Sequence, residues 1–362
     1  MYQDFMKEYL ALGHMSLLPT PPPGHHYYIP HQCVLRPESS STKFRVVFDA
    51  SSKTSTSVSL NETLMVGATI QRELYAILAR FRLNKYALTA DISKIYRQVN
   101  IAAENRDFQL ILWREKSTQA LQTYRLNTVT YGTASAPFLA IRCLFELSKI
   151  YAESHPIASE VISSDFYVDD MLTGASSLEE LETIRREVTE VLKFEGFDLA
   201  KWATNHPSLL DNRGPDKSLK VDPSASIKTL GMRWNPQNDV FHYSLEDSFD
   251  SLPATKRNIL SVIARLFDPL GLLCPLITRA KILLQELWRQ KLDWDESVPM
   301  RLHTSWNRFK QNFLELDKIS IPRYICLLMK LSISTALQMR VRPTAVEYIS
   351  VPWLGQLVYR DC

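Results

Sequence analysis

The sequence predicts a mixed α/β protein whose C-terminal third is helical. Short runs rich in β-branched and aromatic residues alternate with amphipathic segments over roughly the first two thirds of the chain. From Pro253 to Leu292 the apolar residues recur at helical spacing. Hydrophobic residues occupy 45% of the 362 positions and charged residues 22%, which is typical of a globular chain with a sizeable core.

The N-terminal segment predicts a helix, a connector and a strand. Residues 1–18 carry apolar side chains at helical spacing, and the proline-rich run PTPPPGHHYYIPHQCV (19–34) follows them. TKFRVVFDA (42–50) has the composition of a strand, and the Ser/Thr-rich stretch after it is polar enough to be a loop. We therefore treat residues 1–34 as an N-terminal helix with its connector.

The middle of the chain alternates between the two types of element. An amphipathic helix over residues 69–83 leads into the strand KYALTADI, which ends near Asp91. FQLILWRE and QTYRLNTVTYG predict a strand pair, and a helix begins at Pro137, where the missing N–H does no harm. After the run SSDFYVDDMLTGA comes a charged helix over 177–196, and then short strands around KTLGMRWNP and DVFHYSL.

Charge, hydropathy and cysteine content indicate which kinds of partner and which cellular compartment suit the protein. Lys and Arg number 42 against 39 Asp and Glu, a mildly basic balance that is compatible with a polyanionic partner. The apolar runs are too short to span a bilayer, and the first residues do not resemble a signal peptide, so we expect no membrane. Five scattered cysteines without a CxxC pair favour free thiols in a reducing compartment.

Two adjacent carboxylates, Asp169 and Asp170, stand between apolar segments that favour burial. One interpretation is a solvated hairpin tip; the other is a site for a cation. Asp91 supports the second, because pairing of its strand with the hairpin would bring all three carboxylates to one point. Such a set can hold two divalent cations about 3.5–4 Å apart for phosphoryl transfer to a 3′-hydroxyl, and oxygen ligands favour Mg²⁺.

Several sequence motifs around these carboxylates resemble motifs of the polymerase of BEL/Pao long-terminal-repeat retrotransposons. The resemblance covers about residues 1–323. They occur in the family's order: TKFRVVFDAS, SLNETLMVG, ALTADISKIYRQVNI, QLILWRE, TVTYGTASAPFLAIRCL, FYVDDMLTGA, LAKWATN, LGMRWNP and SVIARLFDPLGLLCPLITRAKILLQELW. The resemblance implies a right-hand polymerase fold of the α+β type. Fingers and a ferredoxin-like palm would span 35–245, and a helical thumb or connection would span 246–323.

The resemblance also implies an activity, RNA-directed DNA polymerisation. The substrates would be deoxynucleoside triphosphates, added to a primer 3′-hydroxyl on an RNA or DNA template with two Mg²⁺ ions, for which Mn²⁺ could substitute. Asp91 and Asp169 would be the main metal ligands, helped by the backbone of Ile92, and Asp170 would tune the site and face the primer end. Tyr96 matches an aromatic steric gate that excludes the 2′-hydroxyl; from the sequence alone it reads as a core aromatic.

Further roles follow from the same resemblance, each with a plainer alternative. Lys43 and Arg45 align with cations that hold the incoming triphosphate, or form a solvated strand face. Gly132 leaves room for nucleotide or template, and a tight turn explains it equally well. Lys201 matches a residue proposed to protonate the leaving pyrophosphate, and an ordinary surface lysine is the alternative.

The primer contacts are expected from Tyr167 and from the LGMRW hairpin. Gly231 and Trp234 of that hairpin match the family's primer grip, although Trp234 could equally be a core residue. The helices after Pro253 would contribute phosphate-binding cations that give salt-sensitive affinity. These are Lys256, Arg257, Arg265 and Arg279.

Three departures from the family pattern stand out. Ile95 occupies a position where many reverse transcriptases have a smaller residue before the gate tyrosine. No Asp-Thr-Gly or Asp-Ser-Gly word supports an aspartic protease, and no integrase follows. Residues 324–362 lack the acidic word that would open an RNase H domain, so we expect a degenerate or frame-shifted tail. Two functional alternatives remain: a polymerase of the cytoplasm or of virus-like particles, and an inactive retroelement remnant that at most binds nucleic acid.

Overall fold

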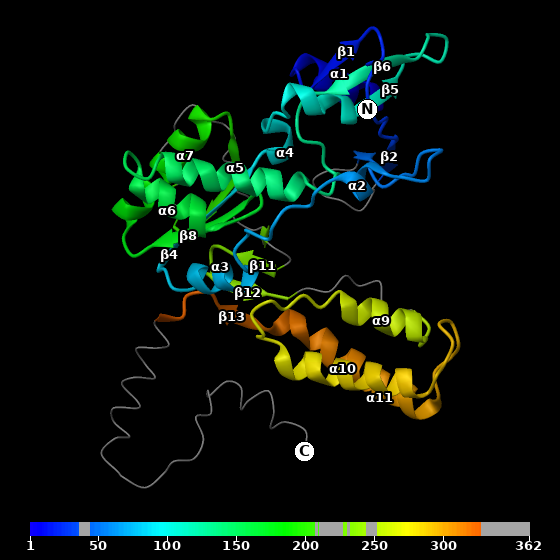
Figure 1. Ribbon diagram of the computed structural model, residues 1–362. Coiled ribbons are helices and arrows are strands. Elements are labelled where there is room, and N and C mark those ends of the chain that lie inside the picture. The colour runs from blue at the N-terminus through cyan, green and yellow to red at the C-terminus, as the bar shows by residue number, and fades with distance from the viewer. Residues whose placement is uncertain (36–43, 207–208, 210–226, 230–231, 244–251, 327–362) are drawn as a thin grey trace.

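The computed structural model of the protein consists of three bodies that lie one beyond the other in space (Figure 1). The structure describes residues 1–35, 44–206, 209, 227–229, 232–243 and 252–326. The N-terminal body and the helices of the C-terminal body lie at opposite ends, with a central body of sheet and helices between them. Three hydrophobic clusters hold these parts together.

The N-terminal body combines a helix with two small antiparallel sheets, of strand order β1-β6-β5 and β2-β3. Met6, Tyr9, Val46 and Phe48 are among the buried residues of its core. The prediction of one helix over 1–18 is corrected here, because Gly13 at φ +72° ends the helix and a strand follows. Its elements are α1 (Tyr2–Ala11), β1 (Met15–Leu18), β2 (His31–Leu35), β3 (Phe44–Phe48), α2 (Leu60–Thr63), the 3₁₀ helix η1 (Ala103–Phe108), β5 (Leu110–Trp113) and β6 (Gln122–Leu126).

The central body is a four-stranded antiparallel sheet of order β7-β8-β4-β9 covered by helices. Its α5 starts at Ala136 with a proline in the first turn, as predicted, and Ser177 caps α7 by accepting the backbone N–H of Glu180. The elements are α3 (Leu74–Phe81), β4 (Tyr86–Ile92), α4 (Ile95–Gln98), α5 (Ala136–Ile150), α6 (Pro156–Ser164), β7 (Phe166–Tyr167), β8 (Asp170–Ala175), α7 (Leu178–Phe194) and β9 (Leu199–Thr204).

Alternation along β4 separates a packed face of this sheet from a second face. Leu88, Ala90 and Ile92 are buried in one cluster with residues of α5, α6 and α7. Ala87, on the opposite face, belongs instead to the cluster that contains α3 and the C-terminal helices. Because side chains of a strand alternate between faces, Asp91 lies on the same face as Ala87.

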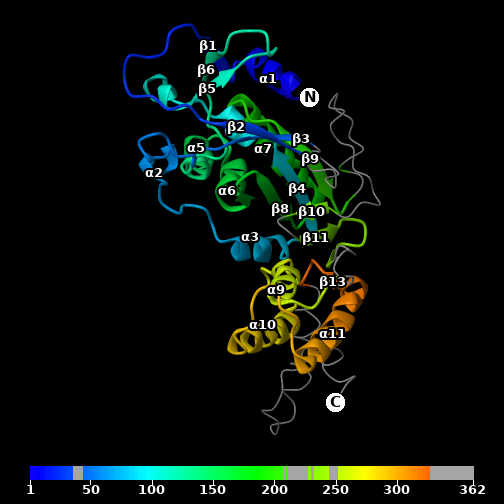
Figure 2. The ribbon, with the colours of Figure 1, turned by 90° about the vertical axis from the view of Figure 1, so that its right-hand side faces the viewer.

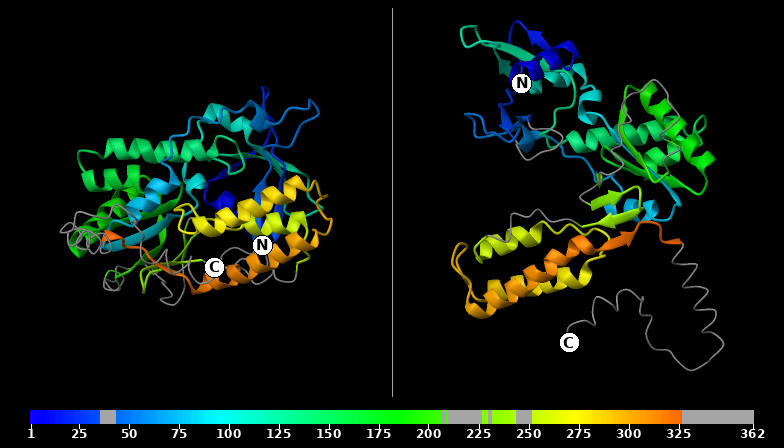
Figure 3. Two further views of the ribbon diagram at one scale, coloured as in Figure 1. Left: turned by 90° about the horizontal axis from the view of Figure 1, so that it is seen from below. Right: turned by 180° about the vertical axis from the view of Figure 1, so that it is seen from behind.

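The C-terminal body consists of a second antiparallel sheet and a layer of helices (Figure 3). The sheet has the order β10-β11-β12-β13, so its strands flank the helices in the sequence on both sides. Its last strand, β13, was not predicted from the sequence, and neither was α11. The elements are β10 (Ile227–Thr229), β11 (Met232–Asn235), β12 (Val240–His242), α9 (Lys256–Ala264), α10 (Cys274–Arg289), α11 (Met300–Leu314), the 3₁₀ helix η3 (Glu315–Lys318) and β13 (Ser320–Pro322).

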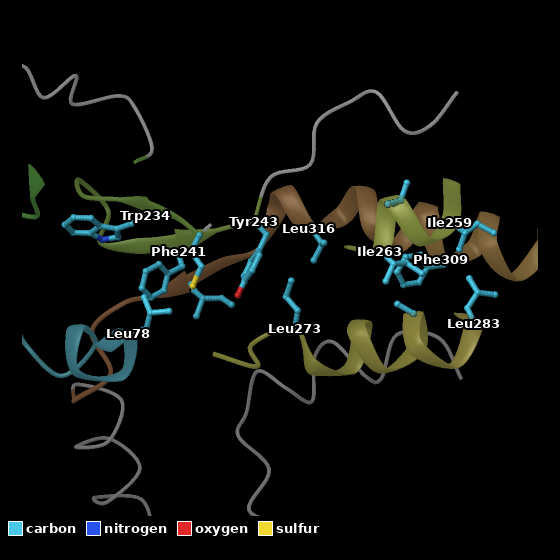
Figure 4. Close-up of a cluster of buried hydrophobic side chains, with 14 of the residues drawn as sticks. Leu78, Trp234, Phe241, Tyr243, Ile259, Ile263, Leu273, Leu283, Phe309 and Leu316 are labelled. Carbon is cyan, nitrogen blue, oxygen red and sulfur yellow. The ribbon is translucent and has the colours of Figure 1, made fainter. Parts of the chain in front are cut away.

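Helix α3 connects the central sheet with the C-terminal body, between which it lies in Figure 2. Ile77, Leu78 and Phe81 of this helix are buried, and the Phe81 ring meets Trp234 edge-on at 5.2 Å between centroids. Figure 4 shows the same cluster continuing from Leu78 through Phe241 and Tyr243 toward the helices. The helix is shorter than the predicted 69–83, since residues 69–73 are not helical and the helix ends at Phe81.

The side chain of Arg323 makes several hydrogen bonds where α3 meets the C-terminal body. It is fully buried, and its guanidinium contacts both carboxylate oxygens of Asp239, at 2.6 Å from Nε and 2.8 Å from Nη2. It also donates to the backbone carbonyls of Phe81, Asn84 and Lys85, at 2.8 Å for Asn84. Asp239 accepts in addition from the indole N–H of Trp234 at 3.0 Å. One cation therefore ties the segment after β13 to the β11–β12 turn and to the end of α3.

Arg323→Ala is expected to destabilise the protein strongly. Removing one partner of a buried, hydrogen-bonded ion pair costs about 3–5 kcal/mol, because the other charge and the carbonyls lose their partners. Urea unfolding followed by circular dichroism measures the change in the free energy of unfolding.

A matched control is Arg257→Ala. Arg257 makes the same two-pronged contact with Asp295, at 2.7 and 2.9 Å, but the two side chains are 58% and 72% exposed. Exposed ion pairs contribute little, so its loss should be small. Equal losses for the two variants would contradict the structural role given to Arg323.

Candidate active site

The antiparallel pairing of β4 with β8 brings the predicted carboxylates together. Asp91 stands directly opposite Asp170 in the register of these strands. The backbone N–H of Ile92 donates to the carbonyl of Asp169 at 2.8 Å. This hydrogen bond holds Asp169 against the end of β4. Asp91, which precedes Asp169 and Asp170 by more than seventy positions in the sequence, therefore lies at the same end of the sheet as they do.

The hairpin that carries Asp169 and Asp170 has a two-residue loop. Tyr167 pairs with Asp170, which leaves Val168 and Asp169 at the tip. Val168 has φ +58°, a left-handed conformation that is strained for a β-branched residue and costs on the order of 1–3 kcal/mol. Such strain persists only where surrounding contacts hold it, and it concentrates at functional sites. The predicted hairpin is present, but its tip is not simply solvated, because Asp169 and Asp170 are half-buried.

The carboxylates form an anionic cluster that lacks full compensation. Burial, and then the negative charges of Asp169 and Asp91, raise the pKa of Asp170 from 3.8 to about 7. Burial also raises the pKa of Asp169, and the charge of Asp91 adds to this effect. A divalent cation would relieve this repulsion, and carboxylate oxygens are ligands that suit Mg²⁺ or Mn²⁺. The residues present therefore fit a metal.

Among the described residues, no three His, Cys, Asp or Glu side chains are grouped closely enough to hold a metal. The ammonium of Lys201 instead contacts Asp91 Oδ2 at 2.9 Å. Lys201 is 70% exposed, has φ +54° and lies where the β4–β9 register shifts by one residue. A bulge of this kind re-aims side chains, and here it directs a cation at the predicted first ligand.

Tyr96 lies within electrostatic range of both Asp169 and Arg45. Tyr96 is half-buried and packs against the central core. Burial raises the pKa of its hydroxyl, the charge of Asp169 raises it further, and the charge of Arg45 lowers it. Arg45 is exposed on β3, while Val46 and Phe48 are buried, as the alternating pattern predicts. The predicted gate residue thus interacts electrostatically with a cation of the N-terminal body and with one of the predicted metal ligands.

The loop around Gly132 packs against the backbone of β3. Gly132 has φ +98°, and a Cβ there would lie 2.3 Å from the carbonyl oxygen of Phe48, so only glycine fits. Asn61 holds this loop: its Nδ2 donates to the Gly132 carbonyl at 3.0 Å, and its Oδ1 accepts from the Ala134 N–H at 2.7 Å. The turn explanation therefore accounts for this glycine. Asn61 was missed as a site residue, since a lone asparagine in SLNETLMVG carries no distinctive signal.

The predicted primer-binding residues fall into different environments. Trp234 is 1% exposed and belongs to the core, which agrees with the alternative interpretation of this residue and leaves its ring no surface for direct contact with a primer. Tyr167 is half-buried beside the same cluster. Lys43 and Gly231 lie outside the described residues.

Two of the four predicted cations of the C-terminal helices are engaged within the protein. Lys256 is buried, 3.7 Å from the ring centroid of Trp288, and donates to the Leu292 carbonyl at 3.2 Å. Arg257 pairs with Asp295. Arg265 and Arg279 are exposed. Within the described part of the chain, no helix is long and apolar enough to cross a membrane.

Comparisons with known proteins agree with the site and the fold. A family model described as reverse transcriptase (RNA-dependent DNA polymerase) matches residues 37–232, more than half of the chain. A second model, described as a Pao retrotransposon-like RNaseH-like domain, matches residues 255–345, a range that includes α9, α10 and α11. None of the curated proteins compared with the chain matches it.

Comparison with solved structures provides evidence on the fold. The foamy viral protease-reverse transcriptase dRH, solved in complex with double-stranded DNA, superposes with a TM-score of 0.58 at 14% identity. The alignment covers 88% of this chain and 47% of that chain, so the protein spans about half the length of this relative. This likeness supports the predicted right-hand polymerase fold. With the match over residues 37–232, it follows that the chain belongs to the reverse transcriptase family, as the polymerase region of a BEL/Pao-type retroelement.

Proposed function

We propose that the protein catalyses RNA-directed DNA synthesis from deoxynucleoside triphosphates. The observation that carries this proposal is the direct opposition of Asp91 and Asp170, with Asp169 tied beside them by the Ile92 N–H. A cluster of half-buried carboxylates whose mutual repulsion raises a pKa is costly to the fold. A reaction that depends on bound cations would explain the arrangement, because the cations would offset this repulsion.

Asp91 and Asp169, with the carbonyl of Ile92, would hold two Mg²⁺ ions, and Asp170 would stabilise the set. When bound, such ions neutralise phosphate charge and lower the pKa of the attacking hydroxyl. The chain's own residues then orient the reactants: Lys43 and Arg45 would hold the triphosphate, and the Tyr96 ring would lie under the deoxyribose.

The reaction joins the primer to the nucleotide by in-line displacement. The primer 3′-oxygen would form a bond with the α-phosphorus and lose its proton to solvent water, while the bond from that phosphorus to the pyrophosphate oxygen would break. If Asp91 held a divalent cation, the Lys201 ammonium, which contacts Asp91 in this structure, would be free for another role. It would then donate its proton to the departing pyrophosphate oxygen and regain a proton from solvent, which balances the proton lost by the primer hydroxyl.

The remaining assignments concern the primer and the boundaries of the domains. Tyr167 and the backbone at Gly231 would contact the primer strand, with Trp234 supporting them from the core. Exposed Arg265 and Arg279 would contact phosphates of the template–primer. We retain fingers and palm at 35–245, a thumb at 246–323 and a degenerate tail at 324–362 as proposals, together with a cytoplasmic or particle-bound location.

An inactive remnant is the second candidate. The contact between Lys201 and Asp91 favours it, because an ammonium group already neutralises the predicted first metal ligand. The two candidates differ in one property, the exchange of that ammonium for a divalent cation.

Primer extension on an RNA template with Mg²⁺ tests the proposed function, beside an Asp169→Asn variant. We expect the parent to incorporate deoxynucleotides and the variant to lose the activity by several orders of magnitude, because the amide cannot replace the carboxylate as a metal ligand.

The exposed Asp198 supplies a matched control, since Asp198→Asn makes the same chemical change on the central body and should leave the rate unchanged. No extension by the parent with Mg²⁺ or Mn²⁺ would leave only the remnant.

Tyr96→Val is expected to relax discrimination against ribonucleotides. The smaller side chain removes the ring that would clash with a 2′-hydroxyl, so the ratio of kcat/KM for the deoxy over the ribo substrate should fall. Single-nucleotide incorporation kinetics with matched pairs measure this ratio. An unchanged ratio would refute the gate assignment.

A further inference from the structure

Gln71, which the sequence did not single out, holds the catalytic hairpin with both ends of its carboxamide. Its Nε2 donates to the carbonyl of Phe166 at 2.9 Å, and its Oε1 accepts the backbone N–H of Val168 at 3.0 Å. These two groups flank Tyr167, directly before the carboxylates. The side chain is half-buried and lies three residues before the start of α3.

The contact occupies the open edge of the central sheet. β7 is the outermost strand, in the order β7-β8-β4-β9, and it pairs on one side only. Phe166 and Val168 therefore direct a carbonyl and an N–H toward that edge. An amide side chain carries one donor and one acceptor, as a peptide group does, so Gln71 completes the ladder in place of a further strand.

The helix that follows Gln71, α3, is anchored near its C-terminal end. Arg80 of α3 donates from Nε to Asp165 Oδ1 at 2.9 Å, and Asp165 also accepts from the Thr173 hydroxyl of β8 at 2.7 Å. At the end of α3, the Phe81 carbonyl accepts from Arg323. Gln71 therefore links the hairpin to a segment that continues directly into this anchored helix.

We infer that Gln71 is a positioning residue for polymerisation, which sets the place of Asp169 through the hairpin backbone. Val168, whose N–H it binds, has the strained left-handed conformation, and Asp169 is the next residue. Without the amide, the tip can relax toward an unstrained conformation and carry the carboxylate with it. This inference rests on the proposed function, in which Asp169 holds a metal ion.

The test compares the parent with Gln71→Met, which keeps the length of the side chain but removes both hydrogen bonds. We expect kcat for deoxynucleotide incorporation to fall about 10–100-fold, since small misplacements of reacting groups have effects of this size. The KM for nucleotide, the Kd for template–primer and the melting temperature should stay close to those of the parent. Should Gln71→Met fail to fold, Gln71→Ala replaces it in the same assay.

Gln119→Met is the matched control. Gln119 also binds backbone, accepting the Lys116 N–H at 3.0 Å, but in an exposed loop of the N-terminal body. Parental kcat in the Gln71 variants, or an equal loss in the Gln119 variant, would overturn the inference.

A second readout does not need turnover. Hydrogen exchange of the peptide that contains Val168, Asp169 and Asp170 should be faster in Gln71→Met than in the parent, and unchanged in Gln119→Met. If the parent fails to extend primers, the proposed function is wrong, while the exchange rates still decide whether Gln71 orders the hairpin. Unchanged exchange in Gln71→Met would overturn that part independently.

Discussion

The antiparallel pairing of β4 with β8 is the constraint on which the rest of the active region depends. It places Asp91 opposite Asp170 and the Ile92 N–H against the Asp169 carbonyl. Helices α5, α6 and α7 cover the other face of the sheet with a continuous apolar layer, so the strands cannot slip by one residue without turning that layer outward. The register that builds the core therefore also builds the carboxylate cluster.

The supports of the cluster converge on α3 and on Arg323. Gln71 holds the hairpin just before α3 begins, Arg80 holds Asp165, and Arg323 holds the carbonyl of Phe81 where the helix ends. Arg323 also binds Asp239 of the β11–β12 turn. Because strands of the second sheet precede and follow the C-terminal helices, this ion pair fixes how the C-terminal body is joined to α3 and the central body.

The sequence predicted the parts that depend on local pattern. Alternation in KFRVVF and KYALTADI indicated the strands, and the spacing of apolar residues indicated α5, α7, α9 and α10. The approach of Asp91 to Asp170 was predicted from the resemblance and from strand pairing. Gln71, Asn61 and Arg323 were not predicted, because each acts through hydrogen bonds to backbone far away in sequence, which leave no periodicity. Trp234 remained ambiguous for a similar reason: an aromatic residue in a strand fits both core and ligand contact until its neighbours are known.

The convergence of three carboxylates is tested most directly by thermal unfolding of the metal-free protein against pH, beside Asp170→Asn. The pKa of Asp170 rises from 3.8 to about 7 on folding, so the folded state binds more protons than the unfolded state between these values. The parent should therefore lose stability relative to the variant as the pH rises from about 4 to about 7, and Mg²⁺ at pH 8 should narrow the gap. Parallel curves for the two proteins, unaffected by Mg²⁺, would contradict the account.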